Sequence, residues 1–188
     1  TLLVNVYWLA PTLVGGTTIS AATASFNDNQ YAAFATNDKG GLGAFGNVIR
    51  LQGFWADAEG SYILPQQQVP AWGLVMAVLW FVVGVGVVKA WRSNRSFTVG
   101  LIAVGIGAIV LAATPLVSWL AHITPFVAGY REPQKFVALL ALVYAVFAGV
   151  GVAHIVQRLH KVKARALAQV GVAGLFVLPI LCTPTLLW

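Results

Sequence analysis

The chain has 188 residues, of which 59% are hydrophobic and only 9% charged, and its formal net charge is +6. Three apolar runs are long enough to cross a hydrocarbon core of about 30 Å, which takes about 20 helical residues. This composition excludes a soluble globular domain and predicts an all-α, polytopic transmembrane helix bundle of about four spans plus a partial N-terminal one. The positive charge does not indicate nucleic acid, because the basic residues cluster in short loops between apolar runs.

The ends of the chain and its single cysteine carry little chemistry. Cys182 cannot form an internal disulfide or a thiolate metal cluster, so we interpret it as a small packing residue. The chain starts at Thr1 without a basic leader, and its one methionine, Met76, lies inside an apolar run. We therefore expect this sequence to be an internal piece of a longer chain.

The first two parts of the chain precede the main apolar region. Residues 1–18 are apolar and predict the end of a transmembrane helix or a re-entrant segment. Residues 19–69 form a long polar loop with turn signals around Asp28 and Asp38. Within this loop, four apolar residues recur at helical spacing and predict a short amphipathic helix on the membrane surface: Leu42, Phe45, Val48 and Ile49.

The remaining part, residues 70–188, predicts a transmembrane helix bundle. We expect its spans at about 72–91, 97–120, 136–156 and 167–186. Pro115 should kink the second span near its far end, because proline lacks the backbone N–H that a helix needs. Small residues at every fourth position predict the face through which the third span packs: Ala141, Ala145, Gly149 and Ala153.

The distribution of lysine and arginine predicts the orientation in a bacterial inner membrane. Seven basic residues fall in the loops at 89–97 and 157–166, against four in the loops at 19–69 and 121–135. The positive-inside rule therefore places the first pair of loops in the cytoplasm and the second pair outside.

No cofactor site stands out in the sequence. No span has an ionisable residue at its centre, as a proton relay or a buried ion site usually requires. His122 and His154 lie at opposite ends of their spans, so they cannot be two haem ligands at one depth. Phosphate-loop and His-Glu-x-x-His patterns are absent from the sequence, and nothing in it supports a divalent metal.

The segment before the third span concentrates charge at the membrane surface. Arg131 and Lys135 are four residues apart, and Pro133 suits the first turn of a helix. The two cations and the free N–H groups of that turn predict a site for a lipid phosphate or pyrophosphate. The alternative is that Glu132 pairs with one of these cations and merely caps the helix.

A second candidate site lies in the long outer loop. Asp57 and Glu59 follow Trp55, and carboxylates accept hydrogen bonds from sugar hydroxyls while an aromatic ring stacks on a sugar face. Solvation of the loop is the alternative role for both carboxylates.

Three stretches together resemble bacterial membrane glycosyltransferases of the GT-C architecture: Tyr7-Trp8-Leu9-Ala10-Pro11, Gly53-Phe54-Trp55, and Arg131-Glu132-Pro133-Gln134-Lys135-Phe136. The resemblance implies a multispan enzyme that takes a sugar from a polyprenyl-phosphate donor at the extracytoplasmic face. It implies that Arg131 and Lys135 meet the donor phosphate, and that Arg50, Trp55, Asp57 and Glu59 shape the sugar or acceptor site. It also places the catalytic carboxylate in an earlier outer loop, outside this sequence.

Two other functions fit the same composition. The chain could be a non-catalytic membrane subunit of a larger complex, since the small-residue faces and apolar spans suit that role equally well. It could also be a lipid or polyprenol transporter that uses Arg131 and Lys135 for binding alone. In each case the expected partners are membrane lipids or other membrane subunits.

Overall fold

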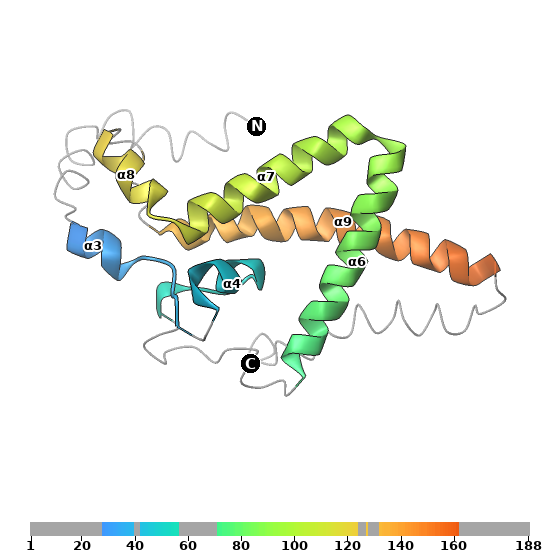
Figure 1. Ribbon diagram of the computed structural model, residues 1–188, viewed down its shortest axis with the longest axis horizontal. Helices are drawn as coiled ribbons and strands as arrows, with labels where there is room; N and C mark the ends of the chain where they lie inside the picture. Colours follow the sequence, from blue (N-terminus) through green and yellow to red (C-terminus); the bar gives the residue numbers. More distant parts are fainter. Residues whose placement is uncertain (1–27, 40–41, 57–70, 124–126, 128–131, 162–188) are drawn as a thin grey trace, which may run out of the picture. The chain divides into compact units, whose positions relative to one another are not determined.

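The computed structural model describes residues 28–39, 42–56, 71–123, 127 and 132–161. Helices account for 84% of this part of the chain, which contains no strand. The elements, in chain order, are α3 (Asp28–Ala33), α4 (Gly43–Ile49), α6 (Trp72–Ser93), α7 (Arg95–Ala113), α8 (Leu116–Ile123), the 3-10 turn η3 (Pro133–Phe136) and α9 (Val137–Lys161) (Figure 1).

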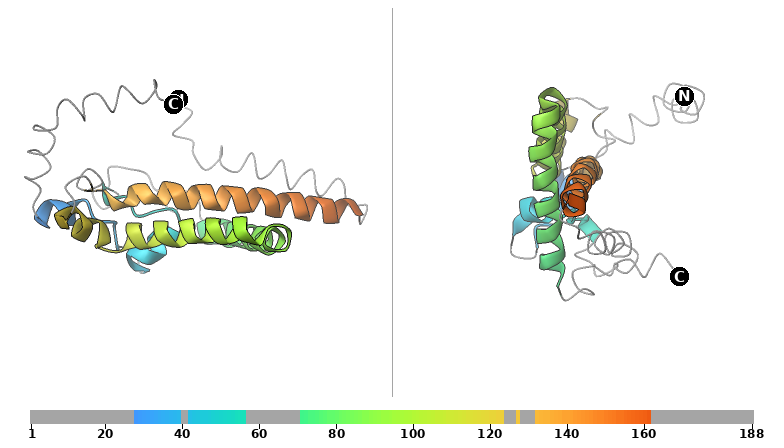
Figure 2. Two further views of the ribbon diagram at one scale, coloured as in Figure 1. Left: turned by 90° about the horizontal axis from the view of Figure 1, so that it is seen from above. Right: turned by 90° about the vertical axis from the view of Figure 1, so that its right-hand side faces the viewer.

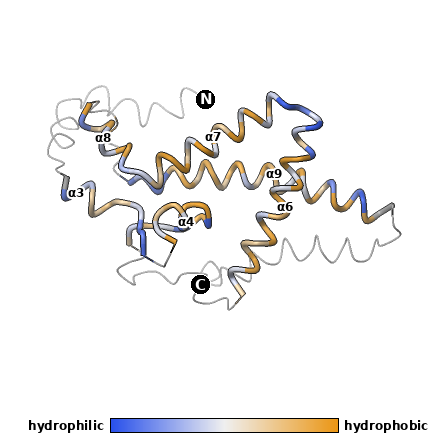
Figure 3. Tube along the Cα trace, in the orientation of Figure 1, coloured by the Kyte–Doolittle hydropathy of each residue, from blue (hydrophilic) through white to orange (hydrophobic). Residues whose placement is uncertain are grey.

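Within the described residues, three helical stretches are long and apolar enough to cross a membrane: Trp72–Ser93, Arg95–Ala113 and Pro133–Leu159. Their mean hydropathies of 2.2, 2.3 and 2.5 agree with the helical membrane class that the composition predicts. Figure 3 shows this apolar character along α6, α7 and α9. The predicted segment 1–18 and the predicted span 167–186 lie outside the described residues, so any span beyond these three stays a prediction.

The chain divides into two compact units. Unit 1 takes residues 1–55 and 109–137, and unit 2 takes residues 56–108 and 138–188. In the described part, unit 1 therefore contains α3, α4, α8, η3 and the end of α7. Unit 2 contains α6, most of α7 and nearly all of α9.

Unit 2 is built on a close crossing of α6 and α9. A Cβ atom added to Gly86 would overlap the carbonyl oxygen of Phe147, and one added to Gly151 would overlap that of Val82. The two backbones are thus in direct contact, which only glycine allows at both points. Figure 1 shows α6, in green, crossing α9, in orange.

The buried face of α9 carries large residues as well as Gly151. Leu140, Val143 and Phe147 are almost fully buried, and α7 lies along the same face at Gly105 (Figure 2). The predicted small-residue face was wrong, because Ala145, Gly149 and Ala153 are exposed and Gly149 has no neighbour within 4 Å of an added Cβ. In a helix that is apolar all round, residue spacing alone does not show which face is buried.

A single residue separates α6 from α7. Asn94 accepts the Phe97 N–H on its side chain at 3.0 Å, which caps the start of α7. The Thr98 hydroxyl donates to the Asn94 carbonyl at 2.9 Å, and Thr98 is completely buried. The predicted loop at 89–97 is therefore a tight turn, because one asparagine satisfies the backbone groups at the helix start. Similarly, α9 continues to Lys161, so the predicted loop at 157–166 begins inside a helix.

The second predicted span is interrupted rather than kinked. The helix α7 ends at Ala113, and α8 begins at Leu116 as a separate helix. Pro115 cannot donate a backbone hydrogen bond to the preceding turn. The Thr114 hydroxyl donates to the Val110 carbonyl at 2.6 Å, and the Ser118 hydroxyl donates to the Pro115 carbonyl at 2.7 Å. The Thr114 hydroxyl also accepts the Leu116 N–H at 3.3 Å, so this side chain bonds to both sides of the break.

Replacing Gly86 with alanine should destabilise unit 2 by about 1–3 kcal/mol, the usual cost of forcing a methyl group into a packed contact. The matched control is Gly149→Ala on the exposed face of α9, where the methyl group meets nothing. Equilibrium unfolding in mixed detergent micelles would measure both. Equal stability of the two variants would contradict the backbone contact of α6 with α9.

Candidate functional site

One buried asparagine on α4 fixes the turn that precedes this helix in unit 1. Asn47 is only 8% exposed, and its side-chain amide donates to the carbonyl of Asn37 at 2.7 Å and to that of Lys39 at 3.0 Å. Both carbonyls lie in the turn that the sequence predicts around Asp38. The neighbouring Val48 is completely buried, whereas Leu42 and Phe45 are exposed. The predicted helix is present, and its buried face is formed by Asn47 and Val48.

The stretch after α4 turns back over this asparagine. Leu51 and Gly53 both have positive φ angles, of 59° and 103°. A Cβ on Gly53 would approach the Thr36 methyl group to 2.7 Å, so this position requires glycine for both conformation and space. The Gly53 carbonyl then accepts the Asn37 N–H at 3.0 Å. The backbone conformation and the close packing thus explain why the Gly53-Phe54-Trp55 stretch begins with glycine.

Gln134 joins the segment before α9 to the stretches around Phe34 and Trp55. In the orientation that satisfies both neighbours, its amide donates to the Phe34 carbonyl at 3.2 Å and accepts the Trp55 indole N–H at 3.3 Å. The Trp55 ring packs edge-on against Phe34, with 4.9 Å between centroids, and lies 5.3 Å from the ring of Phe54. Two stretches that are far apart in the sequence therefore meet in unit 1.

The charged residues before α9 include an exposed ion pair. Lys135 Nζ lies 3.5 Å from Glu132 Oε2, and the Lys135 side chain is 56% exposed. Pro133 occupies the first turn, as predicted, but that turn is a 3-10 helix that leads into α9. The pairing of Glu132 with Lys135 is the alternative that the sequence leaves open. An exposed pair of this kind is worth about 0–1 kcal/mol, so Lys135 is not withheld from a stronger anionic partner.

The other predicted site residues are only partly described. Arg131, Asp57 and Glu59 lie outside the described residues. Arg50 follows α4 as its C-cap and is half-buried. Among the residues that the structure describes, no group of three or more His, Cys, Asp or Glu side chains could hold a metal ion.

Unit 1 contains a pocket of about 450 Å³ beside the end of α7. Its polar lining combines one aromatic phenol, one carboxylate and three aliphatic hydroxyls: Tyr31, Asp38, Thr36, Thr114 and Ser118. Alanines and prolines complete the wall, among them Ala112 and Pro133.

Hydrogen bonds and ring packing fix several of these side chains. The Thr36 hydroxyl donates to the Ala112 carbonyl, which ties the loop after α3 to the end of α7. The ring of Tyr31 packs on His122 of α8, with 5.9 Å between centroids. The hydroxyls of Thr36, Thr114 and Ser118 all donate to carbonyls, so toward a ligand their oxygens can act only as acceptors.

The sequence did not single out Asp38 as a pocket residue. It lies in a predicted turn, and the structure confirms that turn, since Asn37 Oδ1 accepts the Lys39 N–H at 2.9 Å. Asn37 makes the turn contact, and Asp38 is an exposed residue of the pocket lining without an ion pair among the described residues. Asparagine and aspartate both suit such a turn, so the sequence alone could not tell which of the two adjacent side chains makes the turn contact.

Comparison with protein-family models, with curated proteins and with solved structures gave no match. The resemblance to GT-C glycosyltransferases therefore stays a prediction, and so do the roles that it implies for individual residues.

Replacing Gln134 with leucine should loosen the join between the two stretches, because it removes both amide hydrogen bonds. Their net value is about 1–3 kcal/mol. Hydrogen exchange should therefore quicken about tenfold or more at backbone amides between Phe34 and Trp55. Lys135→Gln, at the exposed neighbouring position, is the matched control and should leave these rates unchanged. Equal rates in both variants would show that Gln134 does not hold the stretch between Phe34 and Trp55.

Proposed function

We propose that this chain forms part of a membrane glycosyltransferase that takes a sugar from a polyprenyl-phosphate donor at the extracytoplasmic face. The supporting observation is the contact of Gln134 with Trp55. It joins two of the three stretches that carry the resemblance, and it does so in the unit that contains a polar pocket. In this proposal unit 1 handles the substrates and the apolar helices anchor it in the bilayer.

The pocket of unit 1 has the chemistry that a sugar requires. A volume of about 450 Å³ falls within the usual range for small-ligand sites. Asp38 can accept hydrogen bonds from two hydroxyls, and the oxygens of Thr36 and Ser118 can accept others. Tyr31 adds an aromatic wall. The lining thus offers mainly acceptors, which match the hydroxyl donors of a sugar.

The donor phosphate would be met by Lys135 together with Arg131. Lys135 is exposed at the start of the helical segment that leads into α9, a position where a lipid phosphate lies at the membrane surface. Its bond to Glu132 is weak enough to be exchanged for a phosphate. Arginine supplies the planar donor fork for phosphate oxygens, and lysine supplies a point charge.

The proposed reaction is a displacement at the anomeric carbon. An acceptor hydroxyl oxygen forms a bond to that carbon, the bond from the carbon to the phosphate oxygen breaks, and polyprenyl phosphate departs. The hydroxyl proton passes to a carboxylate base. The chain would contribute by orienting the sugar at Asp38 and by neutralising the charge that builds on the departing phosphate.

A non-catalytic membrane subunit is the second candidate. It is favoured by the composition of α6, α7 and α9, because no ionisable residue lies near the middle of any of them. Such helices serve to pack and to anchor, which a structural subunit also requires.

Replacing Asp38 with asparagine should lower sugar transfer by about 10- to 100-fold, the effect of losing about 1.5–3 kcal/mol of hydrogen bonding to a charged acceptor. The assay is transfer of radiolabelled sugar from polyprenyl-phosphate hexose or pentose to an envelope fraction, in membranes that contain the full-length protein. Lys39→Gln, the exposed neighbour that does not line the pocket, is the control. If the unmodified protein transfers neither sugar, the enzyme proposal is wrong and the subunit is favoured.

Replacing Arg131 with alanine should raise the KM for the polyprenyl-phosphate donor about tenfold or more, since a phosphate loses a charge-assisted donor pair. Thermal unfolding should change little, because the proposed role is to bind the donor. Lys135→Ala should act in the same direction with a smaller effect. A loss of stability as large as the loss of donor use would contradict a binding role.

A further inference from the structure

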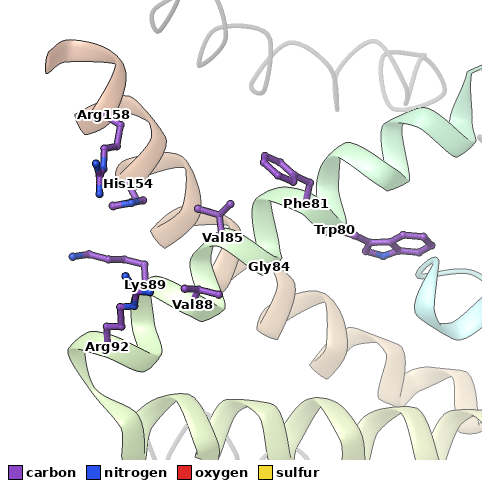
Figure 4. A pocket seen from close by; sticks show the side chains of 9 residues that line it. All are labelled: Trp80, Phe81, Gly84, Val85, Val88, Lys89, Arg92, His154 and Arg158. Atoms are coloured by element: carbon purple, nitrogen blue, oxygen red, sulfur yellow. The ribbon is translucent and has the colours of Figure 1, made fainter. Parts of the chain in front are cut away.

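Unit 2 contains a second pocket, with a volume of about 580 Å³, between α6 and α9. The α6 side of its lining is formed by Trp80, Phe81, Gly84, Val85, Val88, Lys89 and Arg92, and the α9 side by His154 and Arg158. Figure 4 shows that Lys89 and Arg92 approach the same space as His154 and Arg158, while Phe81 and Val85 line the other part.

The crossing of the two helices creates this space. The backbones touch at Gly86 and Gly151, and the helices separate beyond that point (Figure 4). The four basic or imidazole side chains come from the last turns of α6 and from the second half of α9. His154 and Arg158 are four residues apart, and Lys89 and Arg92 three apart, so each pair shares one face of its helix.

The positive charge of this pocket is not balanced within the described structure. Lys89, Arg92 and Arg158 form no ion pair among the described residues. All five acidic residues of the chain lie within 28–59 or at Glu132, so α6, α7 and α9 contain none. Two arginines and a lysine facing one space repel each other, and an anionic occupant would remove that repulsion.

The rest of the lining is apolar and open. Phe81 is 67% exposed, and an added Cβ on Gly84 would meet nothing within 4 Å. The pocket thus has a cationic end near the helix termini and an apolar end toward the middle of α6. Figure 3 shows the same change along the chain, from hydrophilic at the α6–α7 turn to hydrophobic along α6. Since both helices are long enough to span a membrane, we expect the cationic end at headgroup depth.

We propose that this pocket binds an anionic phospholipid, with its phosphate held by Lys89, Arg92 and Arg158 and an acyl chain along Phe81 and Val85. Basic pockets between transmembrane helices are suited to phospholipid headgroups, and arginine offers a fork for phosphate oxygens. A free phosphate would use only the cationic end and leave the apolar wall uncovered. The site belongs to unit 2 and is separate from the donor site proposed at Arg131 and Lys135.

The test is lipid retention by the full-length protein released from nanodiscs that contain equal amounts of phosphatidylglycerol and phosphatidylcholine, measured by native mass spectrometry. The unmodified protein should retain phosphatidylglycerol in preference. The double variant Lys89→Gln with Arg158→Gln should lose this preference by about tenfold or more. The matched control is Arg95→Gln with Lys39→Gln, which removes the same charge outside the pocket. Arg95 stacks on Trp91, with 4.9 Å from its guanidinium carbon to the ring centre.

A second pair of variants keeps every charge. Gly84→Leu should fill the apolar end and reduce retention of phosphatidylglycerol, whereas Gly149→Leu, on the open face of α9, should not. Thermal unfolding of each variant would confirm that unit 2 is intact.

Three results would overturn the proposal. They are a lack of preference in the unmodified protein, an equal loss in the test and control double variants, and retention of phosphatidylglycerol that Gly84→Leu leaves unchanged. A parallel arm uses glycerol 1-phosphate with protein in phosphatidylcholine nanodiscs. Thermal stabilisation by this soluble ligand equal to that by phosphatidylglycerol would show that the pocket takes free phosphate, and the lipid assignment would be wrong.

Discussion

The contact between the backbones of α6 and α9 determines how unit 2 is organised. In a bilayer, apolar side chains gain little by leaving lipid, so helices associate mainly through close packing. Gly86 and Gly151 allow that packing because neither has a side chain to keep the backbones apart. Large residues such as Phe147 and Leu140 are buried along the same helix as Gly151. The same crossing makes the helices diverge toward their ends, where the cationic pocket forms.

The sequence predicted the apolar helices well and their contacts poorly, for one physical reason. About 20 consecutive apolar residues specify a membrane-spanning helix whatever its neighbours are. The buried face is a different matter, because lipid and protein interior are equally apolar and no amphipathic pattern distinguishes them. Small residues occur on more than one face of α9, and the face with Ala145 and Gly149 proved to be exposed. Pro115 was recognised as a disturbance, but the sequence did not show that the Thr114 hydroxyl bonds to both sides of the break.

The candidate site in unit 1 was predictable only where its contacts are local. Glu132 and Lys135 are three residues apart, so their pairing follows from helical spacing. The contact of Trp55 with Gln134 depends on the folding of a long loop, which no local pattern describes. The contacts of Asn47 could not be predicted either. Nothing about an asparagine in a short helix indicates that its side chain donates to two carbonyls of the preceding turn. Basic residues such as Arg158 served only to predict the orientation in the membrane. The sequence did not indicate that α6 and α9 bring several of them to one pocket.

The one-residue turn at Asn94 has a consequence for how the protein enters its membrane. With no loop between them, α6 and α7 cannot be inserted one at a time with a soluble segment waiting between them. Each helix also satisfies its own backbone hydrogen bonds, as a segment in lipid must. The pair therefore enters the bilayer as one helical hairpin rather than as two separately placed helices.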